Sequence, residues 1–135
     1  MSGLFVLDSS VIIDDLRTGC HAERIAACTG MLRISSVVLA ELWRGVITRQ
    51  DRAFLQALAR GRRVLTPTEK NWVDSGQILS DIRRDKGFEP HKLRELHFDT
   101  LIALSAQAHG ARVITSNRAD FELIREYRAF RLEIW

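Results

Sequence analysis

The sequence predicts an α/β fold, a three-layer α/β/α sandwich with a mostly parallel central sheet. Short apolar runs typical of buried strands alternate along the chain with longer segments of helical periodicity. Strands that are joined by helices run parallel and are covered by helices on both faces of the sheet. The length of 135 residues suits one hydrophobic core, so we expect residues 1–135 to form a single domain.

In the first half of the chain, apolar runs that end in polar clusters predict the strands, and capping residues mark the helices. Ser35 or Ser36 is expected to cap the third helix and Asp51 the fourth, and Gly30 is expected to end the second. The expected strands cover 3–8, 32–35 and 64–65, and the expected helices cover 11–16, 21–30, 37–50 and 52–60.

In the second half, Thr68 can cap a long helix that runs to about Lys86. A loop over 87–91 follows. The next helix is expected to start near Leu93 or Leu96 and to end at His109, before Gly110. The remaining elements are a strand over 111–115, a helix over 119–127 and a final strand over 130–135.

The composition is that of a soluble globular protein with a small basic excess. Lys and Arg total 20 against 17 Asp and Glu, and Arg greatly outnumbers Lys. Arg favours bidentate phosphate contacts, although surface solvation explains the composition equally well. The chain contains no apolar stretch near the roughly 20 residues of a transmembrane helix, and its start lacks the basic, apolar pattern of a signal peptide. We therefore expect a cytoplasmic protein.

Four acids, Asp8, Glu41, Asp99 and Asp120, each lie beside an apolar run at the start or end of a predicted element. Sites in parallel sheets form beyond the carboxyl ends of the strands, so these acids can converge. Each like-charge pair at 4 Å costs about 4 kcal/mol at an effective dielectric constant near 20, and a divalent cation relieves that repulsion. Carboxylate oxygens suit Mg²⁺ or Mn²⁺ better than zinc.

Asp99 is the most informative of the four acids. Residues 102, 103 and 106 are Ile, Ala and Ala, which places Asp99 on the core-facing stripe of its helix. A buried carboxylate is costly unless it is paired, hydrogen-bonded or bound to metal.

Each acid also has a purely structural interpretation. Asp8 and Asp120 could cap the helices that follow them, and Asn117 could cap the later helix instead. Glu41 could lie on a solvated helix face, and Asp99 could be a cap if its helix starts later.

Four segments, taken in order, resemble the PIN-domain ribonucleases, and more narrowly the VapC-type toxins of bacterial type II toxin–antitoxin pairs. The resemblance rests on Leu7-Asp8-Ser9-Ser10 with the following Val11–Asp14, on residues 35–42 around Glu41, on residues 97–103 around Asp99, and on residues 114–121 around Asn117 and Asp120. It extends over essentially the whole chain. It implies an endoribonuclease that hydrolyses RNA phosphodiester bonds with Mg²⁺, or with Mn²⁺.

By this resemblance, Asp8, Glu41, Asp99 and Asp120 form the acidic catalytic site, and Asp8, Asp99 and Asp120 are metal ligands. Ser9 supplies a hydroxyl near Asp8. Asn117 is a polar neighbour; because some relatives carry an acid at its position, the number of metal ions held without substrate stays open. Candidates for phosphate contacts are Arg17, Arg44 and Arg118.

The resemblance also implies partners. VapC-type proteins are held inactive by a small VapB-type antitoxin whose C-terminal segment covers the site, and the pair binds operator DNA through the antitoxin. A homodimer is implied as well. Apolar residues of segments 37–49 and 52–60 can contact either partner, or can be ordinary core.

Two other functional classes stay open. A catalytically inactive PIN fold would only bind protein or RNA, and the intact set of acids argues against it. A phospho-receiver signalling domain is also α/β with acids at strand ends. It needs a Lys at the end of a late strand, where this chain has Thr115-Ser116-Asn117.

Overall fold

The computed structural model describes residues 3–28 and 31–135, which form a five-stranded sheet with helices around it. The strand order is β3-β2-β1-β4-β5, and every neighbouring pair is parallel. The predicted α/β fold with a parallel sheet is therefore confirmed. The strands are β1 (Leu4–Leu7), β2 (Leu32–Ser35), β3 (Val64–Leu65), β4 (Ala111–Thr115) and β5 (Leu132–Ile134).

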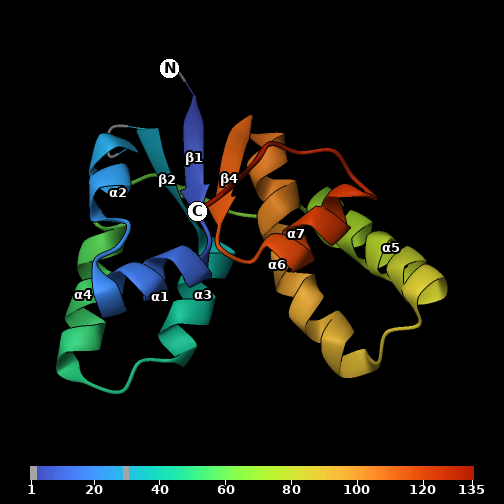
Figure 1. The fold of residues 1–135 in the computed structure, drawn as a ribbon, viewed down its shortest axis with the longest axis horizontal. Coiled ribbons are helices and arrows are strands. Elements are labelled where there is room, and N and C mark those ends of the chain that lie inside the picture. The colour runs from blue at the N-terminus through green and yellow to red at the C-terminus, as the bar shows by residue number, and fades with distance from the viewer. Residues whose placement is uncertain (1–2, 29–30) are drawn as a thin grey trace.

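The helices connect the strands in two groups. The chain steps outward from β1 through β2 to β3, and then crosses back to β4 and β5 on the other side of β1. Right-handed crossovers put the connections of these two halves on opposite faces of the sheet. Figure 1 shows α2 and α4 on one side of the strands and α5 with α6 on the other. The helices are α1 (Ser9–Thr18), α2 (Ala22–Cys28), α3 (Ser36–Arg44), α4 (Arg49–Ala59), α5 (Glu69–Lys86), α6 (Pro90–Ala108) and α7 (Arg118–Arg125).

Helix α6 is the most deeply buried helix among the described residues. Leu96, Leu101, Ile102 and Leu104 are wholly inaccessible to solvent, and α6 contacts β2, β4, α3, α5 and α7. A helix that is apolar around most of its surface must be enclosed in this way. Any polar group on α6 is thus held in a fixed place relative to the sheet.

The predicted helix over 37–50 is wrong in extent, because α3 ends at Arg44 and α4 starts only at Arg49. Asp51 is not the cap of α4. Thr48 is the cap: its hydroxyl accepts from the Asp51 N–H at 3.0 Å, and the Asp51 carboxylate accepts from the Thr48 N–H at 3.1 Å. This reciprocal pair satisfies two N–H groups that the helix itself leaves open. The prediction of Ser35 as the α3 cap is confirmed.

Helix α6 starts at Pro90, earlier than the predicted Leu93 or Leu96, so the expected loop over 87–91 is shortened to residues 87–89. Proline suits the first turn of a helix, since no intrahelical N–H bond is needed there. Relative to those two predicted starts, the extension adds about one to two turns to α6. The predicted Thr68 cap of α5 is confirmed, with Asn71 completing a capping box. The expected helix end at Gly30 falls outside the described residues.

Two smaller points concern the surface of the protein. Cys20 lies before α2, Cys28 is the last residue of α2, and both are free thiols. Within residues 3–28 and 31–135, none of the helices combines the length and the apolar character that crossing a membrane requires.

Candidate active site

The four acids meet at the carboxyl edge of the sheet, where the chain reverses its direction of winding between β1 and β4. Asp8 directly follows β1, and Asp120 lies in the first turn of α7, after β4. Glu41 comes from α3, which follows β2, and Asp99 comes from the middle of α6. One cavity of about 770 Å³ is lined by all four acids together with Ser9, Arg44 and Asn117. Such reversal points are where ligands bind in open α/β sheets.

Asp8 is held by hydroxyl groups from two elements. Its side chain is buried, with Ser10 Oγ and Thr115 Oγ1 each donating to Oδ2 at 2.8 Å. The other oxygen, Oδ1, is buried and has no hydrogen-bond partner among the described residues. Asp8 occupies the cap position of α1, yet its side chain makes no capping bond. Burying a carboxylate oxygen without a hydrogen-bond donor costs free energy. A cation bound to Oδ1 would offset that cost.

Replacing Thr115 with valine is expected to lower the free energy of unfolding by about 1.5–3 kcal/mol, because a buried carboxylate loses a hydroxyl donor. Thr115 is fully buried, and valine keeps its shape. Urea unfolding at pH 7 measures the change, and Thr115→Ser, which keeps the hydroxyl, is the control. Equal losses in both variants would show that the hydroxyl bond to Asp8 has no special part.

Asp99 and Glu41 are strongly perturbed by their surroundings. Burial raises the pKa of Asp99 to about 8, with further increases from the charges of Asp8, Glu41 and Asp120. Burial and the charge of Asp8 likewise raise the pKa of Glu41 to about 7. Asp99 lies inside α6 and is not a helix cap. Like charges held together in a poorly solvated site resist ionisation, and bound positive charge reverses that effect.

Asp120, in contrast, has donors on both oxygens. Lys92 Nζ donates to Oδ1 at 2.8 Å, and Asn117 Nδ2 donates to Oδ2 at 3.1 Å. The hydrogen bond with Asp120 raises the pKa of Lys92. Asn117, not Asp120, caps α7, since its Oδ1 accepts from the Asp120 N–H at 3.4 Å. Lys92 was not predicted as a site residue. It lies seven residues before Asp99, on the same helix face, but the predicted helix began after it.

The hydroxyl groups and basic residues are arranged differently from the prediction. Ser9 donates to Glu41 at 3.4 Å, and the hydroxyl that serves Asp8 belongs to Ser10. Arg44 lines the cavity, and its guanidinium carbon lies 5.1 Å from the centre of the Phe98 ring. His91 and Arg94, which were not predicted, also line the cavity.

The other two predicted arginines do not line the acidic cavity. Arg118 pairs with Glu122 at 3.0 Å on an exposed face of α7. Arg17 lies on α1, in an adjacent cavity. Residues such as Ser10 and Thr115 could have been found from the sequence, because each lies within three residues of a strand end at this edge.

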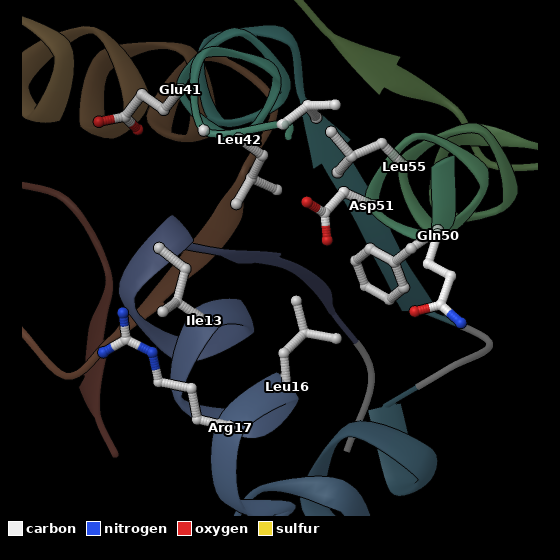
Figure 2. Close-up of a pocket in the computed structure, with 11 residues that line it drawn as sticks. Ile13, Leu16, Arg17, Glu41, Leu42, Gln50, Asp51 and Leu55 are labelled. Carbon is white, nitrogen blue, oxygen red and sulfur yellow. The ribbon is translucent and has the colours of Figure 1, made fainter. Parts of the chain in front are cut away.

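The adjacent cavity, here called the α1–α4 groove, has a volume of about 560 Å³. Figure 2 shows Ile13, Leu16, Leu42 and Leu55 facing one another across it, from α1, α3 and α4. Ile13 and Glu41 line both this groove and the acidic cavity, so the two adjoin. In Figure 2 the Glu41 carboxylate points away from these apolar side chains. The remaining lining residues are Arg17, Gly45, Val46, Gln50, Asp51 and Phe54.

The donor set fits a hard divalent cation. It consists of carboxylate oxygens, one of which is buried without a donor, and Mg²⁺ and Mn²⁺ prefer such ligands. In the part of the chain that the structure describes, no three His, Cys, Asp or Glu side chains form a group that could hold a metal ion as they stand.

An all-parallel α/β sheet with a cluster of acids at its reversal point defines the class of this protein, an α/β domain with an acidic site. The PIN domain family model matches residues 5–127, so the chain belongs to the PIN domain family. This membership overturns the phospho-receiver alternative. No curated protein sequence matches the chain.

Solved structures resemble the chain over nearly its full length. DNA-bound VapBC from Salmonella typhimurium has 26% sequence identity and a TM-score of 0.76, covering 99% of both chains. VapBC2 from Rickettsia felis, bound to a promoter DNA fragment, has 22% identity and a TM-score of 0.74, covering 98% of both. VapBC-1 from nontypeable Haemophilus influenzae has 22% identity and a TM-score of 0.72, covering 98% of both. The resemblance inferred from the four sequence segments is therefore confirmed.

Proposed function

We propose that this protein is a metal-dependent endoribonuclease and the toxin of a VapBC-type toxin–antitoxin pair. The observation that carries the proposal is the unpartnered, buried Oδ1 of Asp8, a residue that lines one cavity together with three further acids. Membership of the PIN domain family and the likeness to VapBC structures support it. Mg²⁺ is the proposed cofactor, and Mn²⁺ is an alternative. The site of action would be the cytoplasm.

Asp8, Asp99 and Asp120 are the proposed metal ligands, and Glu41 would complete the site directly or through water. When bound, the ion would lower the pKa of a water molecule and polarise the scissile phosphate. Ser10 and Thr115 hold Asp8 in a single orientation, with Oδ1 free. The position of Asp99 is fixed by the buried helix α6, so the protein's part is chiefly to orient these groups before substrate arrives.

Basic side chains at the cavity would bind the phosphates that flank the scissile bond. Arg44, Arg94 and His91 line it from α3 and α6. Neutralising phosphate charge in this way gives affinity that falls as salt concentration rises. Arg17, in the adjoining groove, is placed for a more distant phosphate. Arg118 is the weakest candidate, because it already pairs with Glu122.

The proposal is tested by incubating purified protein with single-stranded RNA and Mg²⁺ or Mn²⁺. Cleavage is expected with either ion and is expected to stop when EDTA is added. DNA of the same sequence and the Asp99→Asn variant serve as controls. RNA binding without cleavage in every buffer would instead support an inactive PIN fold that only binds.

The proposed protein partner is a VapB-type antitoxin, as in the VapBC complexes of similar structure. Its C-terminal segment would cover the acidic cavity, and an apolar part would lie in the adjoining α1–α4 groove. The groove presents apolar side chains such as Leu16, which is 57% exposed. Operator DNA would be bound only through the antitoxin. We also propose a homodimer, which light scattering on the purified chain would test.

Replacing Leu16 with glutamate is expected to weaken binding of the cognate antitoxin at least tenfold, because a charge would be buried in an apolar contact. Calorimetric titration with the product of the adjacent short reading frame measures this. RNA cleavage by the free variant should be unchanged. Val73→Glu, at an apolar residue of α5 that is also 57% exposed, is the matched control. Equal affinity of both variants and the wild type would exclude the groove as the antitoxin site.

A further inference from the structure

Lys92 has no role in the proposed function, yet it makes a direct ion pair within the cluster of acids. Its ammonium group lies 2.8 Å from Asp120 Oδ1 and 3.9 Å from Glu95. Lys92 and Asp120 are 28 residues apart in sequence, so the pair joins the start of α6 to the start of α7. The Asp120 side chain is only 16% exposed, and water therefore screens the pair weakly.

The two ends of the acidic cavity differ in what their carboxylates already bind. At the Asp120 end both oxygens accept hydrogen bonds, from Lys92 and from Asn117. At the other end, Asp8 Oδ1 is buried without a partner, and no hydrogen bond to the Asp99 carboxylate is found within residues 3–28 and 31–135. The carboxylate oxygens without a hydrogen-bond donor therefore lie at the Asp8 and Asp99 end of the cavity.

We propose that the Lys92 ammonium group occupies the place at Asp120 that a second divalent ion would otherwise take. The site then binds a single divalent ion, at Asp8, Glu41 and Asp99. This inference rests on the proposed function, and it narrows the ligand set given there by assigning Asp120 to Lys92. Lys92 is a positioning residue in this scheme, acting through Asp120.

Charge balance supports the assignment. Four ionised carboxylates carry −4, and one divalent ion with one ammonium group supplies +3, which leaves −1. A second divalent ion would have to share Asp120 with an ammonium group 2.8 Å away, or displace it. Two cations held on the same carboxylate repel each other, and the Asp120 side chain is only 16% exposed, so water screens that repulsion less than at the surface. Asn117 carries no charge, so it cannot compensate a further ion.

The test counts Mn²⁺ ions bound to the RNA-free protein by isothermal titration calorimetry. The wild type is expected to bind one ion per chain, and Lys92→Met is expected to bind two. Lys92→Arg, which keeps the charge, should bind one. Lys70→Met is the matched control, since Lys70 forms an equivalent pair with Asp74 at 2.9 Å on α5. It should bind one ion, as the wild type does.

Two ions in the wild type, or one ion in a folded Lys92→Met, would overturn the proposal. If Lys92→Met does not fold, as judged by circular dichroism, Asp120→Asn decides the matter. Its Mn²⁺ affinity should stay within threefold of the wild type, and a tenfold loss would make Asp120 a ligand. Stoichiometry is measured without RNA, so a failure to cleave RNA would remove the proposed function and leave this count intact. RNA cleavage by a wild type that binds two ions would support the proposed function and overturn the assignment of Asp120 to Lys92.

Discussion

Replacing Asp99 with asparagine is expected to lower the rate of metal-dependent RNA cleavage by roughly a thousandfold, while raising the stability of the metal-free protein. A metal ion supplies several kcal/mol of transition-state stabilisation, and each 1.36 kcal/mol is worth a factor of ten in rate. Asp99 is a proposed ligand that α6 holds in place. The same carboxylate opposes folding, because it is buried among Asp8, Glu41 and Asp120.

The opposite signs of the two effects make the result easy to interpret. Single-turnover cleavage with Mn²⁺ measures the first effect, and urea unfolding at pH 8 in EDTA measures the second. Asp81→Asn is the control: this acid lies on α5 in an exposed pair with Arg84, and both quantities should stay near the wild type. A cleavage rate that Asp99→Asn leaves unchanged would refute the assignment of the active site. A loss of both activity and stability would point to misfolding instead.

The metal-free protein is expected to become less stable as the pH rises from 5 to 8.5. The pKa values of Asp99 and Glu41 are raised, to about 8 and about 7, above ordinary values of 3.8 and 4.5. Between those limits the folded state holds protons that the unfolded chain has released, so stability falls with increasing pH. At about 1.4 kcal/mol per pKa unit, the combined loss amounts to several kcal/mol.

Urea unfolding in EDTA across this pH range measures the loss, and Asp99→Asn should remove the larger part of it. Mn²⁺ should restore stability most at the alkaline end, where the carboxylates are ionised and bind the ion best. Asp74 and Asp85 do not confound the result. Their pKa values are lowered, so their contributions change only below about pH 4. Stability that is constant or rises between pH 5 and 8.5 would contradict the raised pKa values.

Local patterns were sufficient for most of the fold. Val113 and Ile114, in an apolar run before polar residues, predicted β4, and Thr68 predicted the start of α5. Such signals act within a few residues and survive in any tertiary context. Three helix limits were predicted wrongly: the end of α3, the start of α4 and the start of α6. Thr48 and Asp51 share one capping box, so either could be taken as the cap, and Pro90 resembles a loop residue although it is also favoured at a helix start.

The sequence also determined which acids form the cluster. Each of them follows or interrupts an apolar run, and the place of that run in a parallel sheet can be inferred. The four are Asp8, Glu41, Asp99 and Asp120. Only the tertiary structure decided which groups each acid contacts. It showed that Ser10 and Thr115 hold one oxygen of Asp8 and leave the other bare. It also showed that Lys92 reaches Asp120 across 28 residues. The physical reason is that hydrogen bonds and charge interactions depend on distances of a few ångströms between side chains from different elements, and sequence spacing does not encode those distances.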